Sequence, residues 1–233
     1  GGRPQVRNRV FIAATLIPKG IPNFKGNVEI PNLEPVMQGW DPLSWNLEKD
    51  LPLDKIKSAN EKKNVSLTES EIRWIEAWNE FVLIMRDRLK GEKLPGFPIW
   101  ADAWVHIDEL KIPKGTPDWK KTFLQKNSQF YTDHKVVLNK WLKKWDNLED
   151  FPPSRRKFEW QAQDAKSLWE TIMHFRPSGI RAKKATYVPA LVAITQTSII
   201  GKQKRRITIR EGARLQGLPD WFDFVDQADK LTY

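Results

Sequence analysis

The chain has 233 residues, of which 40% are hydrophobic, enough for one or two domains with a real core. No apolar run reaches the roughly 18 residues of a membrane-spanning helix, and the N-terminus does not resemble a signal peptide, so a cytoplasmic protein without a membrane partner is expected. The absence of cysteine excludes disulfides, thiolate metal sites and a cysteine nucleophile, while the net charge of +10 favours polyanions as partners.

The positive charge is concentrated in two regions. Ten Lys or Arg residues stand against one acid between residues 176 and 214, and eight lysines stand against two acids between residues 114 and 145. A one-sided distribution of this kind is typical of a nucleic-acid-binding face. The three histidines, His106, His134 and His174, do not have the spacing of metal ligands, so no metal site is predicted.

The first half of the chain is expected to contain a strand, a long connection and one strong helix. Residues 9–17 form a continuous apolar run with β-branched members, which predicts a buried strand. Residues 18–67 are rich in proline and predict an irregular connection with short pieces of structure. Thr68 and Glu71 form a capping box that opens a helix ending at Gly91, whose apolar residues follow the 3.6-residue period.

The next region predicts two helices, at about 117–131 and 133–147, with Thr116 as the first cap. Residues 152–162 are then expected to form a loop that contacts DNA, because three adjacent cations lie beside aromatic residues there. The candidate contacts in this loop are Arg155, Arg156, Lys157 and Gln161. A helix at about 164–175 and an apolar strand at 187–194 are expected to follow.

Between them, residues 176–184 combine cations with a glycine, a composition suited to DNA contact. Gly179 permits close approach of the backbone to a groove, Arg176 and Arg181 offer bidentate donors, and Lys183 and Lys184 offer point charges to phosphates. Residues 206–219 then predict a short helix, with a capping box between Thr208 and Glu211 at its start and Gly217 near its end.

The stretch from Arg206 to Pro219 also carries a recognisable pattern, R-x-T-x-R-E-x-x-R-L-Q-G-x-P. It resembles the ninth motif of the DNA (cytosine-5) methyltransferases, which in that family braces the target recognition domain. The residues that match are Arg206, Thr208, Arg210, Glu211, Arg214, Leu215, Gln216, Gly217 and Pro219. The upstream stretch Gln5-Val-Arg-Asn-Arg9 resembles the eighth motif, and the two stretches occur in the order that the family has.

The resemblance implies roles for individual residues. Gln5 and Arg7 match positions that face DNA, and Arg9 matches the position that contacts the target base in support of catalysis. Pro189-Ala190-Leu191 resembles the P-T-L segment that follows the second recognition loop, with alanine in place of threonine, which implies that residues 176–184 are that loop. The residues thus expected to contact DNA are Gln5, Arg7, Arg155, Arg156, Lys157, Gln161, Arg176, Ser178, Gly179, Ile180, Arg181, Lys183 and Lys184.

Other hallmarks of the family are missing from the sequence. There is no F-x-G-x-G loop for S-adenosylmethionine, no E-N-V and no P-C dipeptide, and without cysteine the chain lacks the thiolate that attacks cytosine C6. We therefore expect the C-terminal portion of a methyltransferase, inactive alone, as a piece of a longer protein or a subunit of a split enzyme. Its partners would be double-stranded DNA and the N-terminal catalytic portion, which would bind S-adenosylmethionine.

The expected fold class is α+β: a recognition domain of several helices and short strands, with one strand belonging to the catalytic sheet. The expected boundaries are 1–17 for the end of the catalytic portion, 18–204 for the recognition domain, and 205–233 for the ninth-motif helix and a C-terminal packing segment. Two alternatives remain open. Asp102, Glu109 and Lys111 loosely resemble the metal site of a nuclease, and the basic face could instead belong to a non-catalytic interaction domain.

Overall fold

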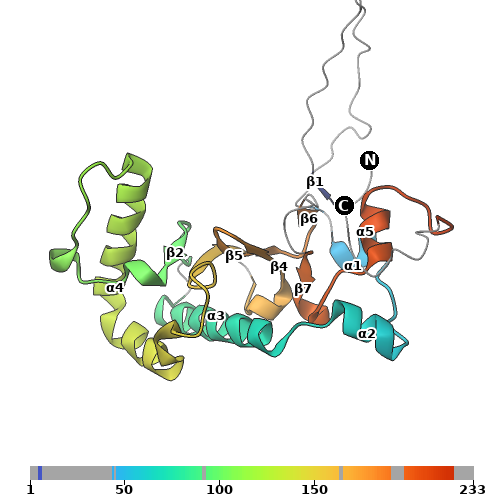
Figure 1. Cartoon of the computed structure of the whole chain (residues 1–233), viewed down its shortest axis with the longest axis horizontal. Helices are drawn as coiled ribbons and strands as arrows, with labels where there is room; N and C mark the ends of the chain where they lie inside the picture. Colours follow the sequence, from blue (N-terminus) through green and yellow to red (C-terminus); the bar gives the residue numbers. More distant parts are fainter. Residues whose placement is uncertain are drawn as a thin grey trace, which may run out of the picture.

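The computed structural model describes residues 44, 46–90, 93–162, 165–189 and 197–222, together with the backbone of residues 5 and 6. Helices and a mixed sheet give an α+β fold, as the sequence predicts (Figure 1). No helix in these ranges is long and apolar enough to cross a membrane. The predicted strand at 9–17, with Arg7 and Arg9, lies outside the described residues.

The centre of the molecule is a six-stranded sheet in the order β2-β3-β5-β4-β7-β8. Its strands are β2 (Ile99–Trp100), β3 (Lys157–Gln161), β4 (Thr171–Arg176), β5 (Gly179–Lys184), β7 (Ile199–Ile200) and β8 (Arg205–Arg206). Strands β3 and β5 are parallel, while the other neighbouring pairs are antiparallel. A separate parallel pair joins β1 (Gln5–Val6) to β6 (Val188–Pro189).

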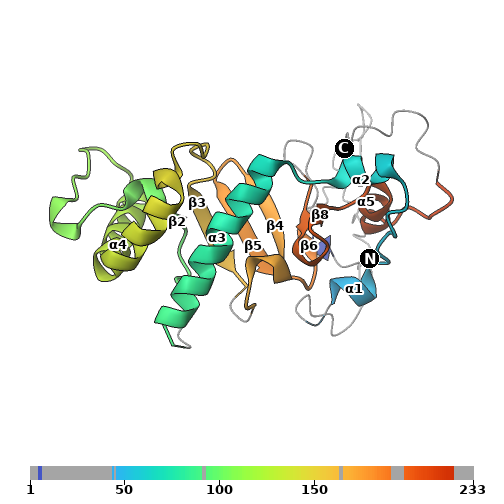
Figure 2. The same ribbon diagram turned by 90° about the horizontal axis from the view of Figure 1, so that it is seen from below.

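Helix α3 (Glu69–Arg88) crosses one face of the sheet (Figure 2). Thr68 caps it in the predicted capping box with Glu71, and the predicted apolar positions build the core. Trp78, fully buried, stacks on Phe158 of β3 with ring centroids 4.9 Å apart and donates from Nε1 to the carbonyl of Arg155 at 2.8 Å. The indole therefore provides apolar area and also satisfies its own polar atom.

Helix α4 (Asp118–Lys144) forms the far end of the molecule beyond β2 (Figure 1). Its backbone leaves the helical region at His134, so the predicted pair of helices is present as two segments joined at a kink. Its second segment packs on α3, and Trp141 donates from Nε1 to the carbonyl of Ala77 at 2.9 Å. The N-terminal cap is Pro117, not the predicted Thr116, whose hydroxyl instead donates to the carbonyl of Pro113.

Short elements complete the described part of the chain. Helices α1 (Leu47–Asp50), α2 (Ala59–Val65) and α5 (Ile209–Leu215) lie near the β8 end of the sheet (Figure 2). The 3-10 turns are η2 (Ala101–Ala103), η3 (Ile107–Glu109), η4 (Asp146–Leu148), η5 (Leu168–Glu170) and η6 (Gly201–Gln203). A second apolar cluster joins α1 and α5 to Ile172 and Ile200, on the sheet face opposite α3.

The predicted helix at 164–175 is wrong. Residues 168–170 form η5 and residues 171–176 form β4, in which five consecutive side chains from Thr171 to Phe175 are buried. A strand covered on both faces has no polar side to create an alternating pattern, and a short apolar run of this kind cannot be distinguished from a buried helix by periodicity.

The two predicted loops are also corrected. Residues 176–184 form a hairpin, with a turn at Pro177 and Ser178 and with β5 hydrogen-bonded on one side to β4 and on the other to β3. Part of the segment at 152–162 is β3. The strand predicted at 187–194 is present as β6 at Val188–Pro189, and residues 190–196 lie outside the described part.

Candidate nucleic-acid interface

Strands β3, β5 and β4 present a row of polar side chains on the face turned away from α3. Side chains alternate between the two faces of a strand, and the register pairs Glu159 with Arg181, Arg181 with His174, and Gln161 with Lys183. The alternate residues, such as Phe158 and Ile180, lie in the core beneath. We call this row the polar sheet face; its members are Lys157, Glu159, Gln161, His174, Arg176, Arg181 and Lys183.

Glu159 is the centre of this face. Its carboxylate accepts from Nε of Arg181 at 2.9 Å and from Nε2 of Gln161 at 2.5 Å, and it lies 3.7 Å from Nη1 of Arg176. These partners come from its own strand and from both following strands of the hairpin. Side chains of the two arginines are about one-third exposed. Glu159 therefore holds Arg181 by a hydrogen bond and lies near Arg176, and both arginine side chains are partly exposed.

Lys183 lies deeper in the same face, with only 8% of its surface exposed. Its Nζ lies 2.8 Å from the centroid of the Tyr187 ring, a cation–π contact. Burial, and secondarily the charge of Arg181, lowers the pKa of Lys183 from its usual value to about 7. The lysine therefore changes charge in the neutral pH range.

His174 is the other buried titratable group on the polar sheet face. Its Nε2 shares a hydrogen bond of 2.5 Å with the hydroxyl of Ser198, which is itself fully buried. Burial is the main cause that lowers the pKa of His174 to about 4, and the cations Arg176, Arg181 and Lys183 act in the same direction. The imidazole is neutral at physiological pH, so it acts here as a hydrogen-bonding group and not as a cation.

The arginines of the turn before β3 have structural contacts. The guanidinium of Arg155 lies 4.6 Å from the ring centroid of Phe175 and donates from Nη1 to the carbonyl of Arg176 at 3.0 Å. Arg156 donates to the carbonyls of Phe151 and Glu149, and its Nη1 lies 3.3 Å from Asp102. Both side chains thus hold the turn to its surroundings.

The remaining predicted contacts lie in different environments. Ile180 is fully buried in the core, so its side chain does not face solvent as the DNA contact expected from the sequence would require. Gly179 has φ +137°, and a Cβ there would lie 2.8 Å from the carbonyl oxygen of Lys157. The glycine is therefore needed for the close approach of β5 to β3. Ser178 is exposed in the turn, while Lys184 is half-buried at the end of β5.

Lys157 and Gln5 complete the predicted set. Lys157 is half-buried, with its Nζ 5.5 Å from the centroid of the Trp100 ring. The backbone of Gln5 pairs with Val188 in the parallel β1–β6 ladder. The N-terminal stretch that resembles the eighth motif thus begins beside the segment that follows β5.

The ninth-motif residue Glu211 points inward at the start of helix α5. Glu211 is fully buried and accepts from Nη1 and Nη2 of Arg205 at 2.9 and 2.7 Å, from the amide of Thr208 at 2.8 Å and from the amide of Asp54 at 2.8 Å. Thr208 caps the helix in the predicted capping box. One carboxylate therefore joins α5 to β8 and to the segment before α2.

The arginines of the motif itself extend this network. Arg206 pairs with Glu71 at the start of α3. Arg214 pairs with Asp54 at 2.6 Å and with Asp220 at 2.8 Å; its bond to Asp220 raises its pKa first, and Asp54 adds to the rise. Arg210 donates to the carbonyl of Phe222 at 2.8 Å, and Gln216 is exposed at the C-terminal cap.

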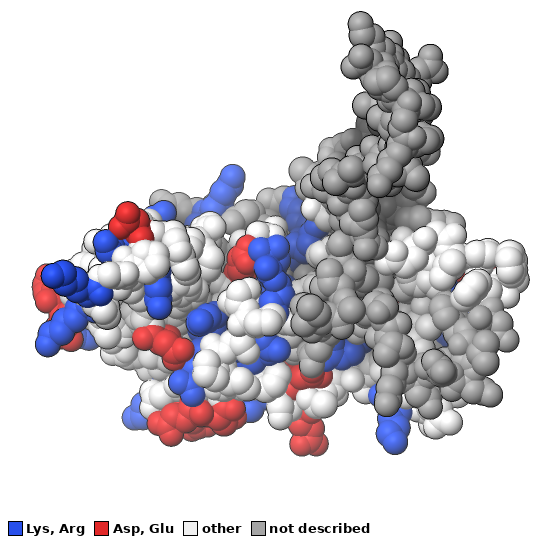
Figure 3. Space-filling model, turned by 45° about the horizontal axis from the view of Figure 1, so that its top comes forward, with Lys and Arg blue, Asp and Glu red and all other residues white. Residues whose placement is uncertain are grey.

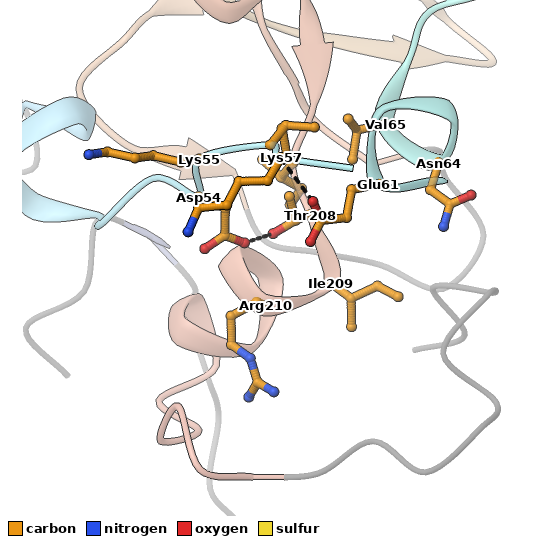
Figure 4. A pocket seen from close by; sticks show the side chains of 11 residues that line it. Asp54, Lys55, Lys57, Glu61, Asn64, Val65, Thr208, Ile209 and Arg210 are labelled. Atoms are coloured by element: carbon orange, nitrogen blue, oxygen red, sulfur yellow. Dashed lines mark hydrogen bonds between the residues drawn. The ribbon is translucent and has the colours of Figure 1, made fainter. Parts of the chain in front are cut away.

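A cavity of about 580 Å³ lies between α2 and the start of α5 (Figure 4). Its two carboxylates are both engaged: Asp54 binds Thr208 and Arg214, and Glu61 caps α2. The rest of the lining includes Lys55, Lys57 and Arg210. Among the described residues that line this cavity there is neither a free carboxylate for ribose hydroxyls nor a glycine-rich turn, so these residues do not fit S-adenosylmethionine.

The nuclease alternative depended on Asp102, Glu109 and Lys111. Asp102 faces Arg156, and Glu109 lies in η3. Within the described ranges, no group of three or more His, Cys, Asp or Glu side chains could hold a metal ion.

Sequence reasoning missed Glu159, Tyr187 and Ser198. One signal was available: in Lys157-Phe158-Glu159-Trp160-Gln161 polar and aromatic residues alternate with a period of two, which is typical of a half-buried strand. That pattern would have placed Glu159 on the same face as Lys157 and Gln161. The contact of Tyr187 with Lys183 and that of Ser198 with His174 depend on tertiary packing.

Figure 3 shows lysine and arginine side chains spread over one side of the described molecule, with acidic side chains between them. The polar sheet face itself carries one acidic residue, Glu159, and four basic residues: Lys157, Arg176, Arg181 and Lys183. The face combines fixed donors with a net positive charge, which suits contact with a polyanion.

Comparison with known proteins agrees with this chemistry. The family model described as C-5 cytosine-specific DNA methylase matches residues 1–233. Type II methyltransferase M.AluI of Cellulosimicrobium cellulans is 38% identical over an alignment 307 positions long, which covers 100% of this chain and 57% of the relative. The chain thus spans little more than half the length of this curated relative. No solved structure matches the chain.

Proposed function

Because the chain belongs to the C-5 cytosine-specific DNA methylase family, we propose that it is the target recognition portion of a DNA (cytosine-5) methyltransferase. In this proposal it binds double-stranded DNA and reads the target sequence in the major groove. The observation that carries the proposal is the polar sheet face, where Glu159 accepts a hydrogen bond from Arg181 and where Arg176 and the buried Lys183 lie on the same face.

The arginines and lysines of this face are proposed to have different roles because their hydrogen-bond donors differ. An arginine held in one direction can donate two hydrogen bonds to the O6 and N7 atoms of guanine, which distinguishes that base from the others. Lysines at the margin contact phosphates and fix the register without reading sequence. Arg181 is therefore proposed as a base reader, and Lys157 and Lys184 as phosphate contacts. Ser178, exposed in the hairpin turn, is proposed to approach the same duplex.

Catalysis in this proposal requires a second portion of the enzyme. Methylation of cytosine begins with a thiolate attack on C6, and this chain has no cysteine. S-adenosylmethionine supplies the methyl group in the complete enzyme and is proposed to bind the catalytic portion, which also supplies the nucleophile. Gln5, Arg7 and Arg9 are proposed to lie where the two portions meet the DNA, with Arg9 contacting the target base.

Selection of bound duplexes from a randomised DNA pool tests the proposal, at low and at moderate salt. An enriched short sequence that survives moderate salt is the expected result, because base contacts depend less on counterion release than phosphate contacts do. Binding without enrichment would remove sequence reading from this chain, and the absence of any binding would favour a non-catalytic interaction domain that meets an acidic protein.

A further inference from the structure

We infer that an aromatic cluster at the α4 end of the polar sheet face binds the sugar–phosphate backbone of the DNA that flanks the target sequence. The cluster consists of Trp100, Trp119 and Phe123, and we call it the aromatic corner. The inference rests on the proposed function in taking the duplex bound to the polar sheet face as the ligand. It goes further in naming a second contact surface, which holds the duplex without reading its bases.

The three rings of the aromatic corner contact one another across two elements. Trp100 belongs to β2, while Trp119 and Phe123 lie one turn apart on the first segment of α4. Ring centroids are 5.5 Å apart for Trp100 and Phe123, 6.1 Å for Trp119 and Phe123, and 6.5 Å for Trp100 and Trp119, with edge-to-face geometry in each pair. These are favourable separations for aromatic pairs, so the corner is a packed unit.

A buried amide side chain ties the two elements of the corner together. Asn127 of α4 is fully buried and accepts a hydrogen bond from the backbone amide of Trp100 at 2.7 Å. Its own amide group donates to the carbonyls of Pro98 at 3.0 Å and Phe123 at 2.9 Å. Because the backbone on both sides is fixed in this way, the rings are held in place before any ligand binds, which lowers the entropic cost of binding.

Trp119 is the part of the aromatic corner that solvent reaches. It is 61% exposed, whereas Trp100 and Phe123 are partly buried. Aromatic side chains are enriched in binding interfaces, where they contribute a large apolar area at a small cost in conformational entropy. An indole that two other rings support and that leaves most of its surface in solvent therefore offers a ready contact area for a partner.

The aromatic corner adjoins the polar sheet face. The register of β2 and β3 places Trp100 opposite Lys157, a member of that face, and Nζ of Lys157 lies 5.5 Å from the centroid of the Trp100 ring. Opposed residues of neighbouring strands project to the same side of a sheet. The first segment of α4 rises beyond β2 on the side of the sheet away from α3 (Figure 1). A duplex that lies on the polar sheet face and extends toward α4 would thus bring its flanking base pairs to the corner.

The charges around the aromatic corner favour a polyanion as the partner. Lys157 contacts the corner itself, and Lys120 and Lys126 are exposed on the same segment of α4. The acid at the start of this segment, Asp118, pairs with Lys121 at 2.8 Å. A DNA strand presents negative phosphates at a regular spacing, with apolar deoxyribose between them. An exposed ring among lysines matches both parts of that strand.

The first arm of the test compares the affinity for two duplexes that carry the sequence enriched in the selection, or an arbitrary sequence if none is enriched. One duplex ends with that sequence, and the other extends beyond it by roughly 10 base pairs, one helical turn, at each end. The unmodified chain should bind the extended duplex more tightly. Trp119→Ala should lose about five- to tenfold in affinity for the extended duplex, because part of an indole ring is no longer buried, and little for the short one.

The loss in Trp119→Ala should be the same for extended duplexes with the enriched sequence and with a scrambled one, because sugar–phosphate contacts carry no sequence information. Trp119→Phe keeps an aromatic ring and should retain part of the affinity. Val136→Ala is the matched control: Val136 is apolar and 73% exposed on the second segment of α4, and its removal should leave the binding of both duplexes unchanged. Unfolding midpoints provide the folding control for all three variants.

The second arm maps the contact directly. A photo-crosslinking side chain placed at position 119 should attach to nucleotides outside the enriched sequence. The same side chain at position 136 should attach to DNA far less, since that position lies on the other segment of the kinked helix.

The outcomes separate this inference from the proposed function. Crosslinks to DNA and a gain from the extended duplex that depends on Trp119, without any sequence selection, would support the aromatic corner and overturn sequence reading by this chain. Sequence-selective binding that is indifferent to Trp119→Ala, or crosslinks from position 119 to bases of the enriched sequence, would overturn the inference and leave the proposed function standing. Crosslinks between two copies of the chain in place of crosslinks to DNA would also overturn it, and no binding of any duplex would overturn both.

Discussion

Arg181, the proposed base reader, is held by a hydrogen bond to a neighbouring strand. Its Nε donates to Glu159, and its side chain is one-third exposed on a strand that is paired on both sides. Removal of a bidentate base reader from such a position reduces discrimination against the wrong base by ~1–3 kcal/mol.

We therefore expect Arg181→Ala to flatten the sequence preference measured by competition between duplexes. Lys184→Ala, at the end of the same strand, should weaken the binding of all duplexes alike, because a phosphate contact is independent of sequence. An unchanged preference in Arg181→Ala would show that another element reads the bases.

Gly179 is a position where the backbone conformation and the close packing both exclude a side chain. Its φ of +137° is strained for residues with a side chain, and a Cβ would meet the carbonyl oxygen of Lys157 at 2.8 Å and its Cβ at 2.9 Å. Gly179→Ala is expected to lower the free energy of unfolding by roughly 1–3 kcal/mol, measured by urea titration.

Two other glycines are matched controls for Gly179→Ala. Gly115 also has a positive φ, at +85°, but a Cβ added there would meet no atom within 4 Å, so Gly115→Ala isolates the backbone cost. Gly96 has open space and no positive φ, so Gly96→Ala should be nearly neutral. Equal losses in all three variants would contradict a packing role for Gly179.

At the scale of the element, helix α5 is held by charge as much as by apolar contact. Glu211 receives both Nη atoms of Arg205 and two backbone amides, and its own side chain is out of contact with solvent. Removing one partner of a buried ion pair costs more than the pair itself contributes, because the other charge is left buried and uncompensated.

Glu211→Gln is thus expected to lower the free energy of unfolding by about 3–5 kcal/mol, measured by denaturant titration. Glu61→Gln is the matched control, because Glu61 occupies the same position of a capping box in α2 but is exposed and caps only its own helix. That change should cost far less than Glu211→Gln, since glutamine also serves in a capping box. Similar losses in both variants would argue against the buried pair.

Helices and strands could be predicted from the sequence where apolar and polar residues separate onto two faces, or where capping residues mark an end. Helix α3 and the capping boxes at Thr68 and Thr208 follow from local residues, and the structure confirms them. Strand β4 was predicted as a helix because its burial on both faces removes the alternating pattern. The turn after β4 and strand β5 were predicted as a loop because a run of cations hides the alternation of Ile180 and Ala182 with Arg181 and Lys183.

For the whole molecule, burial of His174 links stability to pH. The folded protein holds the pKa of His174 at about 4, while an unfolded chain protonates it near 6.5. Between these values the unfolded state binds more protons, so the free energy of unfolding falls as the pH is lowered through this window. Lys183 adds no slope there, because it is charged in both states below about pH 7.

We expect the unmodified chain to lose up to about 3 kcal/mol more stability than His174→Gln between pH 6.5 and pH 4. Denaturant titrations at several pH values measure this difference, and carboxylates common to both proteins cancel in the comparison. Parallel pH profiles for the two proteins would mean that His174 is not held neutral by the fold.

The sequence by itself determined the α+β class, the caps of α3 and α5, the absence of a cysteine nucleophile and the resemblance to the methyltransferase family. These depend on composition, local hydrogen bonding and ordered motifs, which are properties of neighbouring residues. Only the tertiary structure decided that Arg155 and Arg156 brace a turn while Arg181 and Lys183 line the polar sheet face. Strand register and burial arise from residues far apart in the chain, so identical cations acquire different roles according to what packs against them.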